Sequence, residues 1–410
     1  MNTRIQNAKN IFCSEQIDKG LLGFDVDVFL REHWQKRPLL LRGALPEFTG
    51  FLSVDEVLAQ CERSETPARF RSEKEGMLSG PFQLDLNVLP ADGWTVLVQS
   101  LETVFDEAWN LLDLFSFLPR ARLDDVMVSY ARPNGGIGPH FDLYDVFLIQ
   151  GEGRRRWRYS DAPLPEDAKE EASGHFPFTP DHDVILEPGD ILYLPPRVPH
   201  EGSSILPSMT YSIGAAAPRH EDIMGEFLAF CSGEPETVGL DIEGMYTDPD
   251  AEVPTQRGKV PVRLRDETLK RLKELRFDED IVAAFLGRLL TAPRPHTEFP
   301  IDDDVALELE ELSEKDLELH EEESLATLTQ EIQKPGMLKL LPPSRMLHDG
   351  DTQIFMNGDA FVVENAECFL KLADERQVEL PISLNRDEVE IVQFWMAEGF
   401  VVIESHSMTT

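Results

Sequence analysis

Two histidines and one aspartate in the middle of the sequence have the spacing of a metal site. His140 and Asp142 are separated by one residue, and residues i and i+2 of a β-strand point to the same face, so their side chains can converge. A third donor, His200, follows behind the turn Glu187-Pro188-Gly189-Asp190. Two imidazoles and one carboxylate on one face of Fe(II) leave coordination positions open for substrate and oxygen. The sequence therefore predicts an iron site held by His140, Asp142 and His200.

The residues around these donors favour a turn-and-strand arrangement. Glycines at 135, 136 and 138 let the backbone turn tightly into the segment with His140. The pair Pro195-Pro196 makes the approach to His200 rigid. A related barrel that binds zinc, or no metal, fits the same pattern and stays open as an alternative.

A run of arginines offers the cation that a carboxylate-bearing cosubstrate needs inside a barrel. In the segment Arg154–Tyr159, strand parity puts Arg155 on one face with Trp157 and Tyr159, and the remaining arginines on the other face. Because the aromatic face suits the interior, Arg155 is predicted to point inward, where a guanidinium grips a carboxylate through two hydrogen bonds. We expect the other three arginines to face solvent.

The two residues that follow the His-x-Asp segment are candidates for substrate contacts. An aromatic ring and an anion both suit a cationic side chain, and Tyr144 and Asp145 offer one of each. Parity places Tyr144 on the face of the metal ligands and Asp145 on the opposite face. Tyr144 is equally well explained as part of the barrel core.

The spacing of apolar residues predicts the elements that carry these side chains. Between Leu123 and Ala217, short apolar segments alternate with glycine- and proline-rich turns, which is typical of a β-barrel or jelly roll. Residues 15–45 predict a helical entry that Arg37-Pro38 ends, followed by a short buried strand at Leu39–Leu41, and the spacing in residues 96–118 predicts a long helix. Residues 1–217 are therefore expected to form the domain that holds the site.

Two further regions are expected after this domain. Residues 218–335 are predicted to be helical, with an acidic segment at 302–323 that holds twelve acidic residues and one lysine and is either helix or linker. Residues 336–410 predict a small α+β unit that resembles a winged helix. Five basic and thirteen acidic side chains in that unit argue against DNA binding.

The composition limits the classes of protein to which the chain can belong. Its 410 residues exceed the usual size of one domain. The net charge of -38 argues against direct binding of nucleic acid, because phosphate binding needs a basic surface. This charge favours a basic partner, although a solvated acidic surface explains it equally well.

The termini and cysteines indicate a cytoplasmic protein. No apolar run reaches the length of a membrane span, and Met1–Ile5 lacks the apolar core of a signal peptide. The four cysteines, at 13, 61, 231 and 368, form no C-x-x-C pair. They indicate reduced thiols rather than a disulfide framework.

Six segments carry a resemblance to a known family: His33–Pro38, Gly138–Phe147, Gln150–Arg158, Glu187–Tyr193, His200–Gly202 and Tyr246–Asp250. The chain resembles the JmjC/cupin-type 2-oxoglutarate oxygenases, and in particular the bacterial ribosomal oxygenases. The resemblance implies a double-stranded β-helix, or jelly roll, followed by a helical dimerisation region and a winged-helix-like domain. The fold class is thus α+β.

The same resemblance implies a reaction and its cofactors. His140, Asp142 and His200 would bind Fe(II), and Arg155 would hold the C5 carboxylate of 2-oxoglutarate, with O2 as the other cosubstrate. The activity implied is hydroxylation of an arginine, at Cβ, in a basic large-subunit ribosomal protein by a homodimer. Related JmjC enzymes that hydroxylate histidine or demethylate lysine are alternatives, and so is a non-catalytic cupin that binds a basic protein.

Overall fold

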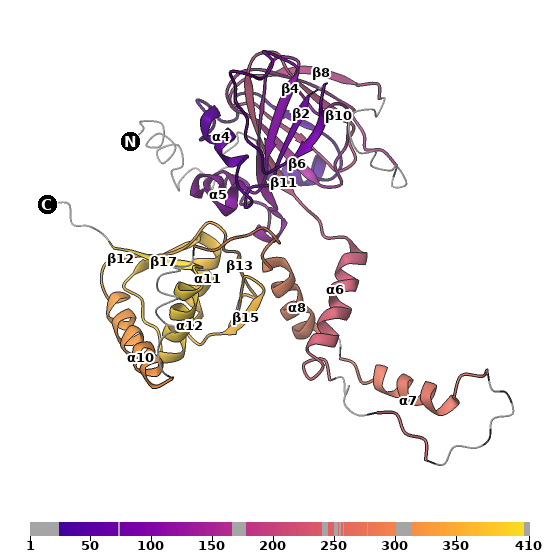
Figure 1. Cartoon of the computed structure of the whole chain (residues 1–410), viewed down its shortest axis with the longest axis vertical. Helices are drawn as coiled ribbons and strands as arrows, with labels where there is room; N and C mark the ends of the chain where they lie inside the picture. Colours follow the sequence, from indigo (N-terminus) through magenta and orange to yellow (C-terminus); the bar gives the residue numbers. More distant parts are fainter. Residues whose placement is uncertain are drawn as a thin grey trace.

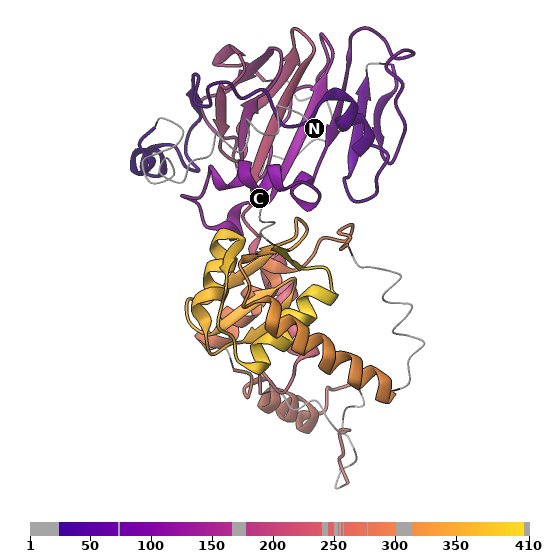
Figure 2. The same ribbon diagram turned by 90° about the vertical axis from the view of Figure 1, so that its left-hand side faces the viewer.

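The structure is a computed structural model with a β-rich half stacked on a smaller α+β unit (Figures 1 and 2). It describes residues 24–72, 74–165, 178–239, 245–249, 253, 256, 258–276, 278–300 and 314–405, with backbone only over 314–321. Cys13, Asp250 and residues 302–313 of the acidic segment lie outside the described residues. Cys61, Cys231 and Cys368 are free thiols. Among the described residues, no helix combines the length and apolar character needed to cross a membrane.

The β-rich half consists of two antiparallel sheets. The larger has the strand order β1-β9-β6-β11-β5-β4-β2-β3, and the smaller has the order β10-β7-β8. The strands are β1 Leu39–Leu41, β2 Ala68–Ser72, β3 Gly76–Ser79, β4 Trp94–Val98, β5 Asp125–Ala131, β6 Asp145–Gln150, β7 Arg155–Tyr159, β8 His182–Leu186, β9 Ile191–Leu194, β10 His200–Ser204 and β11 Ser208–Ala215. Residues from both sheets line a common cavity, as expected for a jelly roll.

Strand β5 shows how the sequence builds this cavity. Its alternate residues Val126 and Val128 are fully buried in the core behind the large sheet. Burying each such side chain contributes about 1.5–3 kcal/mol, which fixes the face that the strand turns to the core. Asp125, Met127 and Ser129 consequently face the cavity.

The helices of this half cover the core side of the large sheet. They are α3 Val26–Glu32, α4 Val54–Gln60, η1 Leu101–Thr103, α5 Asp106–Asp113 and η2 Arg120–Arg122. The prediction of one long helix over residues 96–118 is wrong. The segment Trp94–Val98 is buried at every position of strand β4, and a continuous apolar run does not distinguish a strand from a helix. Ser100, at φ 59°, then separates the strand from the short helices.

A pair of packed helices and a projecting helix follow the β-rich half. They are α6 His220–Gly233, α7 Val262–Leu272 and α8 Glu279–Thr291. The rings of Phe227 and Phe285 join α6 to α8, with centroids 5.1 Å apart. Helix α7 buries none of its described side chains and projects away from the body of the chain (Figure 1).

The C-terminal unit packs two three-stranded sheets, β16-β12-β17 and β13-β14-β15, against helices. Its elements are α10 Glu314–Glu331, β12 Gly336–Leu340, β13 Met346–His348, β14 Gln353–Met356, β15 Asp359–Val362, α11 Ala366–Glu375, β16 Gln377–Leu380, α12 Arg386–Ala397 and β17 Val401–Ser405. The apolar spacing of residues 336–410 does not predict strands β13 and β16, which have only three and four residues. Leu325, Leu328 and Ile332 join this core, so it begins before residue 336. Resemblance to a winged helix stays a prediction.

Candidate active site

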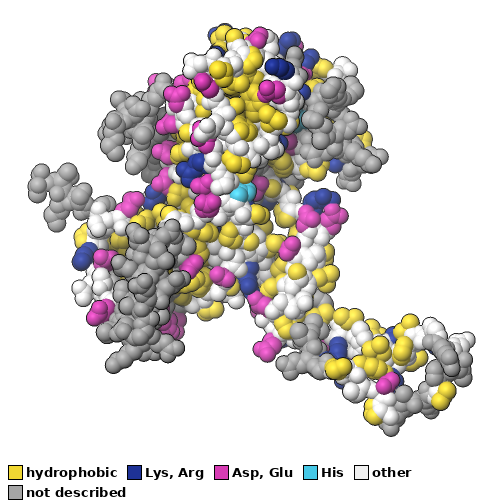
Figure 3. Space-filling model, viewed as in Figure 1, with side chains coloured by type: hydrophobic (Ala, Val, Ile, Leu, Met, Phe, Trp, Pro, Cys, Tyr) yellow, Lys and Arg dark blue, Asp and Glu magenta, His cyan; other side chains and the backbone are white. Residues whose placement is uncertain are grey.

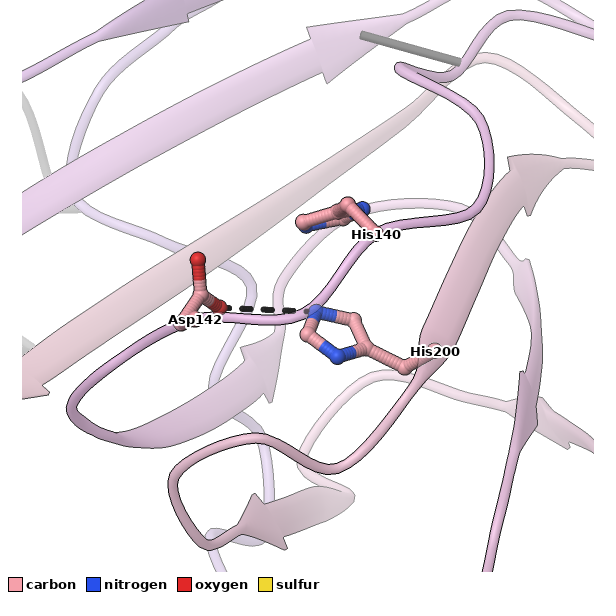
Figure 4. Close-up of side chains that lie close together, drawn as sticks. All are labelled: His140, Asp142 and His200. Atoms are coloured by element: carbon pink, nitrogen blue, oxygen red, sulfur yellow. Dashed lines mark ion pairs between the residues drawn. The ribbon is translucent and has the colours of Figure 1, made fainter. Parts of the chain in front are cut away.

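The three predicted metal donors meet in the cavity of the β-rich half (Figure 4). One ligand atom from each of His140, Asp142 and His200 lies within 4.8 Å of the others. The Nε2 atom of His200 is 3.5 Å from Oδ2 of Asp142. His200 begins β10, and the backbone of His140 pairs with it through N–H···O bonds of 3.0 and 2.8 Å.

The predicted strand through the His-x-Asp segment is not present. His140 forms an isolated bridge only, and Asp142 lies in the connection between β5 and β6. The backbone carbonyl of Asp142 accepts a bond from the N–H of Arg197, 2.6 Å away. Contacts with the turn before β10, rather than strand pairing, therefore hold the His-x-Asp segment in place.

The hydrogen bonds of the two histidines fix which ring nitrogen faces the centre. Nδ1 of His140 is 2.9 Å from the carbonyl of Gly138, and Nδ1 of His200 is 2.9 Å from the carbonyl of Val198. A carbonyl oxygen only accepts, so each Nδ1 carries the proton and each Nε2 is free to bind a metal. Gly138 adopts φ 86°, a left-handed conformation that suits glycine.

Burial governs the charge of these donors. Burial, and then the neighbouring imidazole of His140, lower the pKa of His200 well below its ordinary value, so this imidazole stays neutral as a ligand must. Burial raises the pKa of Asp142, an effect opposed by His140, by a hydrogen bond from Tyr144 and by Arg69. A divalent cation would favour the ionised carboxylate in this position. The nitrogen and oxygen donors thus fit Fe(II).

Arg155 points into the same cavity, as strand parity predicts. It is 6% exposed, and Trp157 and Tyr159 are buried on its face of β7. Its Nη1 donates to Oγ of Ser129 at 2.7 Å, but its Nε has no hydrogen-bond partner. Among the described residues no carboxylate pairs with it, and burial lowers its pKa to about 10. A buried guanidinium in this state is a binding site for an anion.

The outward arginines of the same segment are engaged with acidic partners. Arg154 pairs with Glu187 at 2.8 Å, and Arg156 and Arg158 pair with Asp183 and Glu201. These pairs lie on the outer face of the small sheet. The predicted division of the two faces of this strand matches the geometry.

The two candidate substrate contacts, Tyr144 and Asp145, lie in different surroundings in the structure. Tyr144 lines the cavity and is 39% exposed, so it is not packed as core. Asp145 is fully buried and does not line the cavity. Its carboxylate accepts hydrogen bonds from the hydroxyl of Tyr193 at 2.6 Å and from Nε2 of Gln35 at 3.0 Å. The geometry therefore corrects the assignment of Asp145, whose carboxylate supports the scaffold behind the site.

The sequence reading missed an acidic residue of the cavity wall. Asp125 begins β5 and lines the cavity, which has a volume of about 760 Å³. A Cβ placed on Gly214 would lie 3.0 Å from Oδ1 of Asp125 and 3.7 Å from the ring of Tyr144. Burial, Glu102 and Asp124 raise the pKa of Asp125 to about 7. The sequence did hold a signal for this position. Strand alternation from Asp125 through Ser129 puts Asp125 on the same face as Ser129, opposite the two buried valines.

Comparison with known proteins finds a JmjC domain and similar proteins. The JmjC domain profile matches residues 110–223. The chain is 35% identical over 261 residues to the ribosomal protein uL16 3-hydroxylase of Escherichia coli, and 33% identical over 267 residues to a probable ribosomal oxygenase of Haemophilus influenzae. The chain carries a JmjC domain and is similar to ribosomal oxygenases. The alignments cover 61% and 62% of this chain and 66% and 63% of those proteins, just under two thirds of their length.

The structures of ribosomal oxygenases extend the similarity over nearly the whole chain. The E. coli ribosomal oxygenase YcfD, in complex with cobalt and 2-oxoglutarate, superposes with a TM-score of 0.73 at 27% identity. That match covers 94% of this chain and 99% of YcfD. It confirms the predicted JmjC/cupin fold.

Proposed function

We propose that this protein is a ribosomal oxygenase, an Fe(II)- and 2-oxoglutarate-dependent hydroxylase of a ribosomal protein. One observation carries the proposal. His140, Asp142 and His200 converge beside a buried arginine that has no carboxylate partner among the described residues, and all four line one cavity. Two similarities support it. The chain resembles the uL16 3-hydroxylase of E. coli, and its fold matches that of YcfD, which binds cobalt and 2-oxoglutarate.

Each group of this chain has a defined part in the reaction. The two Nε2 atoms and the Asp142 carboxylate would hold Fe(II), which when bound would supply the oxidising chemistry with 2-oxoglutarate and O2. Arg155 binds the C5 carboxylate of 2-oxoglutarate, and its bond to Ser129 sets the direction of the guanidinium. Apolar side chains of the lining, including Val146, Leu148 and Trp157, exclude water from the reacting centre.

The far end of the cavity supports arginine as the substrate side chain. Asp125 provides an anion and Tyr144 an aromatic surface, and both adjoin Gly214, which leaves space between them. Asp125 and Ser129 are four positions apart on β5, a distance of about 13 Å at the usual rise of a strand. A substrate guanidinium at Asp125 therefore does not compete with the carboxylate at Arg155. The reacting carbon, expected to be Cβ, then lies between the two ends.

The acidic charge supports a basic protein substrate. With a net charge of -38, the chain attracts a protein rich in lysine and arginine and repels nucleic acid. This fits a free ribosomal protein in the cytoplasm as the partner. Histidine hydroxylation and lysine demethylation are tested as alternatives with peptides that carry those residues.

We also propose that the protein is a homodimer formed through helices α6 and α7. Leu228 of α6 and Leu269 and Leu272 of α7 are 68%, 47% and 54% exposed, and apolar side chains gather on this arm (Figure 3). A helix of the length of α7 is marginal alone in water. A second copy would cover this apolar surface, and Leu228→Glu should then convert a dimer to a monomer in light scattering. Wild-type protein that is monomeric at micromolar concentration would contradict the dimer.

The function is tested by spectroscopy and product analysis. Anaerobic Fe(II) and 2-oxoglutarate should give a visible charge-transfer band, and His140→Ala should abolish it. With oxygen and a basic ribosomal-protein peptide, succinate should form and one arginine should gain one oxygen atom. A protein that gives neither the band nor succinate with any peptide would be a binding cupin instead.

A further inference from the structure

A buried ionic cluster joins the C-terminal half of the chain to the strand that carries Asp125. Glu102 of η1 is 1% exposed, and its Oε1 lies 3.4 Å from Nη1 of Arg294 and 3.7 Å from Nη2 of Arg345. Arg294 follows α8, and Arg345 immediately precedes β13 in the C-terminal unit. Both arginines therefore reach the cluster from outside the β-rich domain.

The cluster holds the residues on both sides of Asp125. Oε2 of Glu102 accepts the backbone N–H of Val126 at 2.9 Å. On the other side, Nη2 of Arg345 donates to the carbonyl of Asp124 at 2.5 Å, and Arg294 donates to the same carbonyl and to Oδ1 of Asp124. The position of Asp125 is thus fixed from its two neighbours, although no bond reaches it directly from either arginine.

A third connection reaches the Asp125 carboxylate itself. Nη1 of Arg294 donates to Oγ of Ser100 at 2.8 Å, and the backbone N–H of Ser100 donates to the carboxylate of Asp125. The charge of Arg294 also opposes the rise in the pKa of Asp125. Removing this charge would leave less of the carboxylate ionised near neutral pH.

We propose that Arg294 and Arg345 are positioning residues that make recognition of a cationic substrate depend on the docked C-terminal unit. This inference rests on the proposed role of Asp125 as the partner of the substrate guanidinium. The iron donors and Arg155 lie outside the cluster. Disturbing the cluster therefore weakens substrate binding and spares the handling of 2-oxoglutarate.

The same interface offers a matched control. Lys339 of β12 pairs with Asp106 of α5 at 2.5 Å and makes none of the contacts to Asp124, Val126 or Ser100. Lys339→Met removes one ion pair between the two units and leaves the cluster intact. A role in docking alone predicts equal effects of Lys339→Met and Arg345→Met, whereas the positioning role predicts an effect of the second only.

The experiment compares kinetic constants of full-length variants. Arg294→Gln and Arg345→Met should raise the KM for an arginine peptide about 3- to 30-fold. The kcat, the affinity for 2-oxoglutarate and peptide-free succinate formation should stay within about twofold. Arg345→Lys keeps the positive charge and one donor nitrogen, so its KM for the peptide should lie between those of the wild type and Arg345→Met. This variant keeps the test valid if Arg345→Met folds poorly.

The pH profile gives a second readout. The charged groups that face Asp125 are Glu102, Asp124, Arg294 and Arg345, with Tyr144 across the cavity. Because Arg294 favours the ionised carboxylate, Arg294→Gln should move the acid limb of 1/KM to higher pH.

Three results separate this inference from the function on which it rests. If Asp125→Asn raises the KM for the peptide but Arg294→Gln and Arg345→Met change neither KM nor its pH profile, positioning by the cluster is wrong. An effect of Lys339→Met equal to that of Arg345→Met also contradicts it. If Asp125→Asn itself leaves KM unchanged, the proposed recognition of arginine fails.

Discussion

Replacing Arg155 should separate cosubstrate binding from folding stability. Arg155 is buried without a carboxylate partner among the described residues, and burial lowers its pKa from 12.5 to about 10. That change corresponds to a cost of roughly 3 kcal/mol for keeping the charge in the folded protein without cosubstrate. At neutral pH the guanidinium is charged, so this cost is fully present.

The same charge becomes favourable once a carboxylate arrives. Removing one partner of a buried, hydrogen-bonded charge pair costs about 2–5 kcal/mol, which is about 30- to 5,000-fold in affinity. Arg155→Gln keeps a donor near Ser129 and loses the charge. We therefore expect its affinity for 2-oxoglutarate to fall by that factor, while its melting temperature without cosubstrate is equal to or above that of the wild type.

A control on the same strand makes the test specific. Arg156 lies on the outer face of β7 and pairs with Asp183, with both side chains nearly half exposed. Exposed pairs of this kind contribute little because water screens them, so Arg156→Gln should leave 2-oxoglutarate affinity unchanged. Calorimetric titration with 2-oxoglutarate and thermal unfolding supply both quantities. Wild-type affinity in Arg155→Gln, or an equal loss in Arg156→Gln, would refute the reasoning.

Three further outcomes are expected from the geometry of the cavity. His140→Ala should reduce hydroxylation by more than about 100-fold, measured by succinate release, because it removes a metal ligand; near-normal turnover would contradict the iron site. Gly214→Ala should raise the KM for the peptide about tenfold without changing 2-oxoglutarate affinity, since its Cβ would lie 3.0 Å from Asp125, and an unchanged KM would place the substrate elsewhere. In the wild type the KM for an arginine peptide should fall as pH rises through about 7, because Asp125 ionises there and its charge attracts the guanidinium; a KM independent of pH would exclude this pairing.

Strand parity predicted those parts of the site that depend on local geometry. It separated Arg155 from Arg154 and Arg156, because successive side chains of a strand point to opposite faces whatever the fold around them. Parity also placed Asp145 opposite the ligand face, and the structure has it buried behind the site, but residues 141–144 form no strand, so this agreement does not come from strand geometry. An acidic residue next to the metal ligands suits a cationic substrate, which is why Asp145 was a candidate. Its partners Tyr193 and Gln35 are distant in sequence, so only the fold shows that its carboxylate is already occupied.

Features that depend on contacts distant in sequence were beyond the sequence patterns. The periodicity of residues 96–118 indicated one helix, because a strand buried on both faces has no alternation to reveal it. Asp125 looked like an ordinary polar residue at the start of a strand. Its importance comes from Gly214 and Tyr144, which the fold brings beside it from β11 and from the loop before β6.

Strand β5 connects the two ends of the cavity and sets the distance between them. Ser129 orients Arg155 at one end, and Asp125 stands at the other end on the same face. A slip of one residue in its pairing with β11 would turn both side chains into the core and expose Val126 and Val128 to the cavity. The buried valines therefore do more than stabilise the sheet. In the proposed function, they would hold the cosubstrate carboxylate at Arg155 and the substrate cation at Asp125 in one register, beside the metal donors that line the same cavity.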